Sequence, residues 1–245
     1  MALTERQNEI LRKLKEDKSA AVSVLAKDLY VSEATIRRDL AEMKSMGLIE
    51  RSHGGALLPE NSEEISIFFR MEKNASEKER AATKALPHLS TFKSVFIDSS
   101  STALALAERI DLSYKTVVTN NLQTAIQLSK KPNINLILLG GNVHFNTNSA
   151  TGSWTARQLA DFSLDLMISS CAAIIGSEVF ERSLEQKEIK RAAFKRCQKR
   201  ILLIDHTKFS ASGTYRLSAL SEYDLVVTDT APPYELEVGN TKLVY

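Results

Sequence analysis

Two adjacent arginines, Arg37 and Arg38, stand with Thr35 in a segment whose residue spacing suits recognition of another molecule. The opposite side of the same segment carries apolar residues at i, i+4 and i+7, which are Ile36, Leu40 and Met43. This spacing predicts a helix with one buried face and one face of arginine and threonine. Such a helix suits the major groove of DNA, where arginine can donate two hydrogen bonds to guanine.

Two further helices are predicted ahead of this recognition helix, over residues 4–16 and 21–29, each with an apolar side. Ser32 is placed to cap the recognition helix, because its hydroxyl can accept a hydrogen bond from a backbone N–H of the first turn. The short gap between Leu29 and Ser32 leaves room only for a tight turn. The second and third helices must therefore cross steeply, as in a helix-turn-helix.

A pair of glycines, Gly54 and Gly55, stands between two short apolar runs, one ending at Arg51 and one starting at Ala56. Paired glycines in this setting indicate a β-hairpin. The hairpin would form a wing beside the recognition helix, with Arg51 and His53 placed to reach phosphate groups or the minor groove.

Ordinary packing can explain parts of this pattern. Three short amphipathic helices can form a plain bundle, and Glu33 with Arg37 can be a surface ion pair at i,i+4. Residues 1–58 are nearly balanced in charge, so bulk electrostatics does not favour nucleic acid. The combined order of helix, helix, capped arginine-bearing helix and Gly-Gly hairpin favours DNA binding over the bundle.

The composition of the whole chain limits the class of protein. Its 245 residues, 43% hydrophobic and 25% charged, fit one large or two modest globular domains, and the net charge is only +2. No stretch predicts a transmembrane helix, and the N-terminus lacks the apolar core of a signal peptide, so we expect a cytoplasmic protein. Cys171, in an apolar stretch, and Cys197, in a helical pattern, are expected to be buried thiols. The four histidines are scattered, and we expect no metal site and no cofactor.

The sequence pattern changes after a linker at residues 59–62, which predicts a first domain over residues 1–58 and a second over residues 59–245. A mostly helical segment over residues 63–86 precedes alternating strands and helices. The strands are predicted at residues 94–98, 115–119, 134–139, 164–169, 200–205 and 225–228, and the helices at residues 101–110, 121–129 and 184–198. This alternation predicts an α/β domain with a mainly parallel sheet.

Polar residues gather where these strands end. The set comprises Asp98, Ser100, Ser101, Thr102, Thr119, Asn120, Gly140, Gly141, Asp205 and Lys208. Ligands of open α/β sheets bind beyond the carboxyl ends of the strands, and free N–H groups at helix starts attract anions. Hydroxyl donors, the charge of Lys208 and the polar groups of Asp98, Asn120 and Asp205 could bind a phosphate on a small polyhydroxyl ligand. Each motif alone is better explained by helix capping or a turn, but their convergence on one edge favours a pocket.

Two blocks of the sequence resemble the DeoR family of bacterial transcription regulators. The first block joins Thr35-Ile-Arg-Arg-Asp-Leu40 to Gly47-Leu-Ile-Glu-Arg-Ser-His-Gly-Gly-Ala56 and resembles the DNA-binding domain of that family. The resemblance implies a winged helix-turn-helix. It places the segment from Ser32 to Arg38, Glu33 included, in the major groove, and the segment from Arg51 to Gly55 in the wing.

The second block resembles the DeoR sensor domain through Arg70-x3-Asn74-x3-Lys78, Val118-Thr-Asn120, Leu138-Leu-Gly-Gly141, Thr151-Gly152, Lys190-Arg191 and Asp205-x-x-Lys208. That domain is similar in fold to ribose-phosphate isomerases and CoA transferases, and it binds phosphorylated sugars or related metabolites as effectors. The resemblance adds Arg70, Lys78 and Gly152 to the expected effector-binding residues. Ser100 stands where the family usually has glycine, so we expect altered or weakened effector binding.

Three functions are compatible with the sequence. The first is a ligand-responsive regulator, most often a repressor in this family, which binds double-stranded DNA as a homodimer or homotetramer and responds to a phosphorylated metabolite. The second is an isomerase-like enzyme in which Asp98, Asp205 and Lys208 move protons on a sugar phosphate. An isomerase has no need for the N-terminal domain, so we expect no enzyme. The third is a constitutive DNA-binding protein whose second domain only oligomerises.

Overall fold

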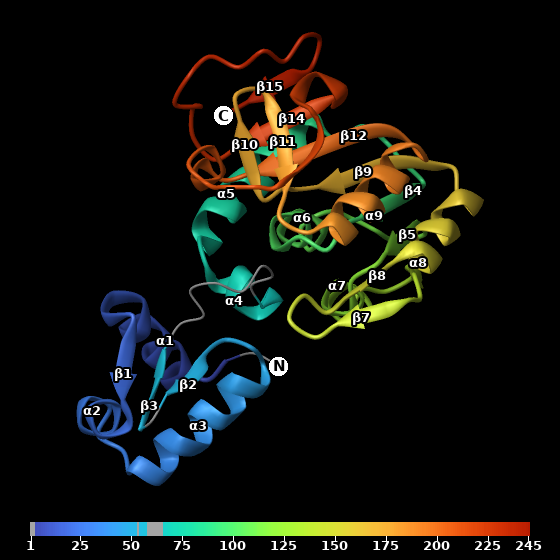
Figure 1. Cartoon of the computed structure of the whole chain (residues 1–245). Helices are drawn as coiled ribbons and strands as arrows, with labels where there is room; N and C mark the ends of the chain where they lie inside the picture. Colours follow the sequence, from blue (N-terminus) through green and yellow to red (C-terminus); the bar gives the residue numbers. More distant parts are fainter. Residues whose placement is uncertain (1–2, 53, 58–65) are drawn as a thin grey trace. The chain divides into compact units, whose positions relative to one another are not determined.

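The chain forms two compact units, Met1–Phe69 and Arg70–Tyr245, in a computed structural model that describes residues 3–52, 54–57 and 66–245 (Figure 1). The division between the units falls within a short helix, α4 (Ile67–Glu72). The predicted domain boundary between residues 58 and 59 lies outside the described residues and stays a prediction. Among the helices of the described residues, none combines the length and the apolar character needed to cross a lipid bilayer.

The first unit contains the three predicted helices and a small antiparallel sheet. In chain order its elements are α1 (Glu5–Asp17), β1 (Ser19–Ala21), α2 (Val22–Asp28), α3 (Glu33–Ser45), β2 (Glu50–Ser52) and β3 (Gly55–Leu57). The Ser32 hydroxyl accepts a hydrogen bond from the Thr35 N–H at 3.2 Å and so caps α3, as predicted. Thr4 caps α1 in the same way, and the Gln7 side chain accepts a bond from the Thr4 N–H in return.

The three helices of this unit bury one shared apolar core. Its fully buried side chains come from every helix and include Ile10, Leu11, Leu14, Val22, Leu25, Ile36, Leu40 and Met43. Burying a side chain of this size contributes about 1.5–3 kcal/mol. The predicted apolar stripe of α3 therefore anchors that helix and turns its polar face to solvent.

The predicted hairpin forms, and a third strand joins it. β2 and β3 pair antiparallel, and β1 pairs with the other side of β3, which gives the order β1-β3-β2. No sequence pattern predicts β1, because three residues are too few to show an alternation. Gly55 is required in β3, since a Cβ at this position would collide with the Ala20 carbonyl oxygen of β1.

The second unit is built on a seven-stranded sheet in the order β15-β14-β12-β9-β4-β5-β6, in which all neighbouring strands are parallel. Its strands are β4 (Ser94–Ile97), β5 (Thr116–Thr119), β6 (Asn135–Leu138), β9 (Leu164–Ser169), β12 (Cys197–Ile204), β14 (Leu225–Thr228) and β15 (Lys242–Val244). The prediction of an α/β fold with a mainly parallel sheet is confirmed. Because the strands are parallel, their carboxyl ends lie along one side of the sheet, termed here the carboxyl edge.

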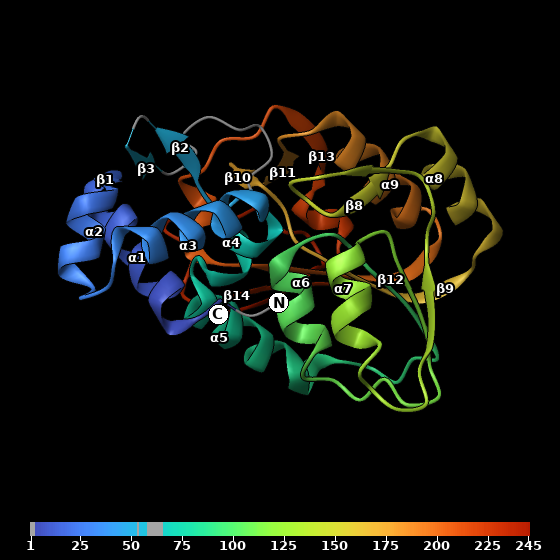
Figure 2. The same cartoon turned by 90° about the horizontal axis from the view of Figure 1, so that it is seen from below.

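Successive residues of these strands enter two cores on opposite faces of the sheet. In β4, Phe96 packs into one core, and Val95 and Ile97 pack into the other. One face is covered by α5 (Ala75–Ala85), α6 (Ser101–Ala107) and α7 (Leu122–Leu128), and the other by α8 (Ser153–Gln158) and α9 (Leu184–Phe194) (Figure 2). Burial on both faces explains why these strands are continuous apolar runs.

Two smaller antiparallel pieces are not predicted by the sequence. A three-stranded sheet consists of β10 (Ala173–Ile175), β11 (Glu178–Glu181) and β13 (Tyr215–Ala219), and a hairpin consists of β7 (Asn142–His144) and β8 (Ser149–Thr151). Short 3₁₀ turns occupy Leu86–His88, Leu159–Asp161, His206–Phe209 and Leu220–Glu222. The strands β7, β8 and β10 have three residues each, which is too few to show a period.

Two predicted helices need correction. The segment over residues 63–86 begins outside the described residues and is broken at Asn74, whose φ of +54° separates α4 from α5. The helix predicted over residues 184–198 ends at Phe194, and Cys197 lies in β12 rather than in a helix. Pairing of Cys197 with Leu164 of β9 outweighs the local helical pattern.

Candidate functional site

The arginine-bearing face of α3 is open to solvent. Arg37 and Arg38 are exposed, and the Arg37 side chain keeps 56% of its accessible surface. Arg37 pairs with Glu33 at 2.8 Å, so the surface ion pair considered from the sequence does form. Exposed pairs of this kind contribute only about 0.3–0.5 kcal/mol, so the guanidinium can exchange Glu33 for another partner. The half-buried Thr35 places its hydroxyl 2.9 Å from that of Ser32.

Two polar contacts hold α3 against α1. Arg6 forms an ion pair with the buried carboxylate of Asp39 at 2.5 Å, and Gln7 donates to the Glu42 carboxylate at 2.9 Å. A guanidinium that donates through two nitrogens to one carboxylate fixes orientation as well as adding stability. The exposed face of α3 is therefore presented at a fixed angle within its unit.

The β2–β3 hairpin lies beside α3. The Arg51 guanidinium is 3.5 Å from the Arg37 carbonyl oxygen. Gly54 is exposed at the turn with φ +88°, and Gly55 is buried against β1. His53 lies outside the described residues, so its contact with DNA stays a prediction, as do those of the other wing residues.

In the second unit, Asp98 at the end of β4 is fully buried and surrounded by protein groups. Its carboxylate accepts hydrogen bonds from the N–H groups of Ser100 at 2.9 Å and Ser170 at 3.1 Å, and from the Ser169 hydroxyl at 2.7 Å. Lys190 of α9 pairs with it at 2.9 Å. Burial acts to raise the pKa of Asp98, but the Lys190 charge and these hydrogen bonds outweigh it and hold the pKa below its usual value. Asp98 is thus an ionised anchor, and its contact with an effector stays a prediction.

Lys190 joins Asp98 to a second buried carboxylate. Its ammonium lies 2.7 Å from Glu181 of β11 and donates to the Ser170 carbonyl at 2.7 Å. Burial acts to lower the pKa of Lys190, but the charges of Asp98 and Glu181 outweigh it and raise the pKa above its usual value. Burial also raises the pKa of Glu181. The sequence indicates Lys190 only as part of a family motif, because a helical lysine is usually solvated.

The loop after Asp98 caps α6. The Ser100 hydroxyl accepts a hydrogen bond from the Ala103 N–H at 3.2 Å and donates to Asp98. Ser100 has φ −90°, an ordinary extended conformation, so the backbone here does not require glycine. Ser101 and Thr102 are buried in the first turn of α6. The Ser100 side chain therefore belongs to the buried network.

A second cluster brings together residues that are far apart in the sequence. The buried Asp205, at the end of β12, accepts hydrogen bonds from the Thr207 N–H at 3.1 Å and from the Asn74 side-chain amide at 3.3 Å. Lys208 follows on the same 3₁₀ turn, and its charge acts on the buried ammonium of Lys78 in α5.

Positive charge accumulates around Lys78. Burial and the charges of Lys208, Arg70 and Lys73 together lower the pKa of Lys78 to about 7, although the charge of Asp205 acts in the opposite direction. Of the residues expected from the sequence, Arg70, Lys78, Asp205 and Lys208 therefore lie in one cluster.

The ends of β5 and β6 form a third group, which is tied to the β7–β8 hairpin. The Asn120 amide donates to the Ala150 carbonyl at 3.0 Å, and its Oδ1 is buried with no protein partner among the described residues. Thr119 is buried and accepts a hydrogen bond from the Asn121 N–H at 3.2 Å. A buried acceptor without a partner is costly, so Asn120 Oδ1 is a position to which a ligand hydroxyl can donate.

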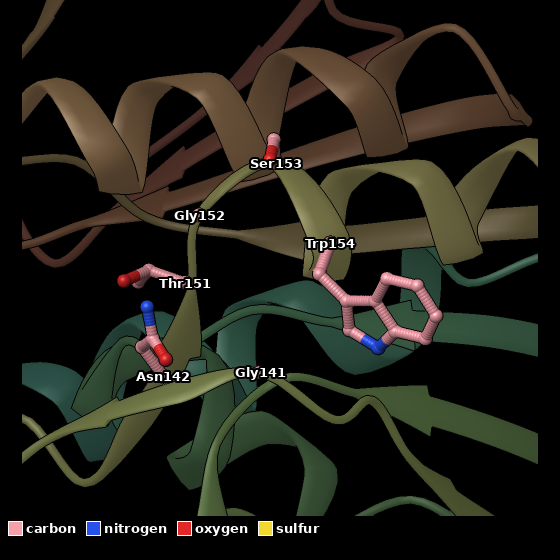
Figure 3. Close-up of a pocket in the computed structure, with 6 residues that line it drawn as sticks. All are labelled: Gly141, Asn142, Thr151, Gly152, Ser153 and Trp154. Carbon is pink, nitrogen blue, oxygen red and sulfur yellow. The ribbon is translucent and has the colours of Figure 1, made fainter.

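A pocket of about 380 Å³ lies where β6 meets the hairpin. It is lined by Gly141, Asn142, Thr151, Gly152, Ser153 and Trp154 (Figure 3). Asn142 and Thr151 pair across the hairpin and lie together, and the exposed Trp154 indole stands apart from them (Figure 3). Gly141 follows the exposed Gly140 and has to be glycine, since a Cβ here would collide with the Thr155 hydroxyl. Two residues expected from the sequence, Gly141 and Gly152, thus line this pocket.

Side-chain hydrogen bonds link the Asp98 loop to the hairpin. The Ser99 hydroxyl donates to Gln186 of α9 at 2.7 Å, and the Gln186 amide donates to the Ser149 hydroxyl of β8 at 2.6 Å. The sequence gives no signal for Gln186 or Ser149, because neither follows a strand of the large sheet. These buried hydrogen bonds fix the Asp98 loop and the β7–β8 hairpin in position relative to each other.

Among the described residues, no group of histidine, cysteine, aspartate or glutamate side chains could hold a metal ion. Cys171 and Cys197 are buried and form no disulfide, and burial raises the pKa of both thiols to about 12. Both thiols are therefore neutral at pH 7.

Family models match both units of the chain. A model described as the DeoR C terminal sensor domain matches residues 73–230, and a model described as the DeoR-like helix-turn-helix domain matches residues 6–62. The chain belongs to the DeoR family. The resemblance drawn from the sequence motifs is therefore confirmed.

DeoR-family relatives match nearly the whole chain. The HTH-type transcriptional regulator GolR of Listeria innocua is 36% identical over 92% of this chain and 90% of its own length. The glycerol-3-phosphate regulon repressor of Escherichia coli is 32% identical over 95% of this chain and 93% of its own length. Among solved structures, ribose 5-phosphate isomerase A of Methanocaldococcus jannaschii is similar at 10% identity, with a TM-score of 0.40, over 56% of this chain and 55% of that enzyme.

Proposed function

We propose that this DeoR-family chain is a transcription regulator in which α3 reads the base edges of an operator in the major groove. The observation that carries the proposal is the exposed Arg37–Arg38 face, which the buried core and the Arg6–Asp39 pair hold at a fixed angle. Direct readout requires donors in a fixed orientation, and arginine can bond guanine through two of them. Ser32, Thr35 and the wing would then supply the contacts to the phosphate backbone that set the register.

We infer that the effector is a small metabolite with a phosphate group, bound at the carboxyl edge. Lys208 and Arg70 supply positive charge there, and Lys78 adds to it when its amine is protonated. Asn120 Oδ1 can accept a hydrogen bond from a sugar hydroxyl. The pocket beside Gly141, which lies after the end of β6 and is lined by other residues, has a volume within the range of small-molecule sites. A relative whose name is glycerol-3-phosphate regulon repressor supports this class of effector.

The regulator is proposed to act as a dimer or tetramer in the bacterial cytoplasm, with residues 1–58 binding DNA and residues 59–245 sensing the effector. Paired recognition helices read two half-sites about one helical turn apart. Coupling between an effector site and a DNA site typically changes operator affinity by about 5- to 150-fold.

The geometry of Asp98 supports a structural role rather than catalysis. A general base needs a pKa near the working pH and access to its substrate. Asp98 is fully buried, and its pKa is held below the usual value. Incubation of the chain with ribose 5-phosphate tests for catalysis. Turnover of this sugar phosphate that the Asp205→Asn variant abolishes would contradict a purely regulatory role.

Selection from a random DNA pool with the full chain, followed by footprinting, tests the DNA proposal. We expect enrichment of one repeated half-site, and failure to enrich any sequence would overturn the proposal. Titration of the bound DNA with glycerol 3-phosphate and other sugar phosphates then tests the effector. A changed operator affinity supports the sensor, whereas constant affinity with every compound favours the constitutive DNA-binding protein.

A further inference from the structure

The junction between α4 and α5 is fastened to the carboxyl edge by side chains spaced four residues apart. Arg70 donates to the Ser99 carbonyl at 3.3 Å, in the loop after β4. Asn74, the residue with positive φ between the two helices, donates to the Asp205 carboxylate at 3.3 Å. The third member of the series is Lys78. The junction is therefore in direct contact with the loops expected to bind the effector.

Lys78 turns back toward the end of α4. Its side chain is buried, and its ammonium donates to the carbonyl oxygens of Arg70 and Lys73. The last carbonyl groups of a helix have no partner within the helix and need donors from elsewhere. The Lys78 ammonium therefore closes the last turn of α4.

Positive charge exceeds negative charge around this ammonium. Lys208, Arg70 and Lys73 repel the charge of Lys78, and Asp205 attracts it. The Asp205 carboxylate already accepts hydrogen bonds from its own turn, so it is shared among several donors. A phosphate dianion beside Lys208 would supply the negative charge that this cluster lacks.

We propose that Lys78 is the switch of this regulator: a phosphate group bound beside Lys208 draws the Lys78 ammonium off the Arg70 and Lys73 carbonyls and loosens the last turn of α4. The inference rests on the proposed function, in which a phosphorylated effector binds at this edge. The carbonyl oxygens of Arg70 and Lys73 carry no net charge, whereas a phosphate oxygen adds the attraction of an opposite charge to its hydrogen bond, and this added attraction drives the exchange.

α4 can carry the signal because the division between the two units falls within it. Phe68 and Phe69 pack against the core of the first unit, and Arg70 begins the second unit. A change in the last turn of α4 therefore acts on the stretch of chain that leads into the DNA-binding unit.

Hydrogen exchange of the full chain, read on peptides covering residues 67–74, tests this switch with inorganic phosphate and glycerol 3-phosphate as probes. In the wild-type chain we expect a bound probe to speed exchange in this segment. In Lys78→Met we expect fast exchange without a probe and no further change with one. Lys78→Arg keeps the charge and the donors, so it should restore slow exchange.

Lys84→Met is the matched control, because Lys84 lies on the same helix and also donates to a backbone carbonyl, that of Asp229 at 2.7 Å. This variant should exchange and respond like the wild type. Lys208→Met should keep exchange slow over residues 67–74 and weaken probe binding, which calorimetry measures.

The outcomes separate the switch from the effector site. If a probe binds the wild-type chain and exchange over residues 67–74 stays the same, the switch is wrong and the effector site stands. Unchanged exchange in Lys78→Met without a probe also rejects the switch. If calorimetry detects binding of neither probe, the proposed effector site is overturned and the switch falls with it.

Discussion

The arginine face of α3 and the carboxyl edge of the sheet are both polar, yet the protein holds them in opposite ways. Arg37 and Arg38 are exposed, and the ion pair of Arg37 is a weak surface contact to Glu33 on its own helix. Asp98 and Lys190 are buried and bound to each other. The arginine side chains of α3 are therefore exposed to solvent, whereas the polar side chains at the carboxyl edge are packed inside the second unit.

This difference decides what a substitution means in each region. A change on the exposed face of α3 leaves the packing of its unit intact, so lost DNA binding reports recognition. A substitution in the buried network lowers the stability of the second unit. Its effect on effector affinity can therefore be interpreted only after the stability of the variant has been measured. The comparison predicts large losses of stability at the edge and losses of binding alone at α3.

The largest expected effect follows removal of the buried anion. Asp98→Ala leaves Lys190 with one carboxylate whose pKa burial already raises, and we expect the second unit to lose about 3–5 kcal/mol of stability. Urea denaturation of the full chain measures it. Asp111→Ala removes an exposed aspartate that accepts a hydrogen bond from the Ser113 N–H, and should leave the urea midpoint close to that of the wild type. Equal urea midpoints for Asp98→Ala and wild type would show that the buried network does not stabilise the second unit, and would contradict the contrast with α3.

The next effect is a loss of operator affinity without a loss of stability. Arg37→Ala or Arg38→Ala should weaken binding to the selected operator by about 1–3 kcal/mol if that arginine bonds a guanine. Fluorescence anisotropy measures the affinity, and thermal unfolding checks the fold. Arg12→Ala is a matched control, because Arg12 is exposed on α1 and pairs with Glu16 at i,i+4. Unchanged affinity in both Arg37→Ala and Arg38→Ala would show that α3 is not the reading helix.

A smaller effect is a pH dependence of stability that comes from Lys78. The folded chain lowers the pKa of Lys78 to about 7 from 10.5, so between these values the unfolded chain binds a proton that the folded chain does not. Stability should therefore rise with pH across this window, by up to about 1.4 kcal/mol per pH unit. Urea midpoints measured from pH 7 to 10 should rise less in Lys78→Met than in Lys84→Met. An equal rise of the urea midpoint with pH in both variants would contradict the assignment of this pH dependence to Lys78.

The smallest effect is expected at Ser100, where the family usually has glycine. Ser100→Gly removes the cap of α6, a loss that by itself costs only a few tenths of a kcal/mol. The variant also removes the hydrogen bond from Ser100 to Asp98, but that carboxylate keeps its bonds to Ser169, Ser170 and Lys190. If Ser100 narrows effector choice, the variant should give larger thermal shifts than wild type with a panel of sugar phosphates. A strong shift of the wild-type chain with a common hexose or pentose phosphate would count against an altered pocket.

Local patterns predicted much of both units, because their cause lies within a few residues. The apolar stripe and the Ser32 cap predict α3, and the continuous apolar runs predict the central strands of the parallel sheet. The same patterns missed β1 and the β7–β8 hairpin, whose strands are too short to show a period. They also placed Cys197 in a helix, because its pairing with Leu164 joins residues distant in the sequence.

The sequence by itself determined the family, the order of the elements and the polar residues that end the strands, since each of these is a property of neighbouring residues. Only the tertiary structure decided what those polar residues do. It buried Asp98 and gave it Lys190 from another element, and it placed the Lys78 ammonium on the end of α4. The physical reason is that burial and charge pairing depend on which distant segments come together in space. The spacing of residues within one segment carries no information about those distant contacts.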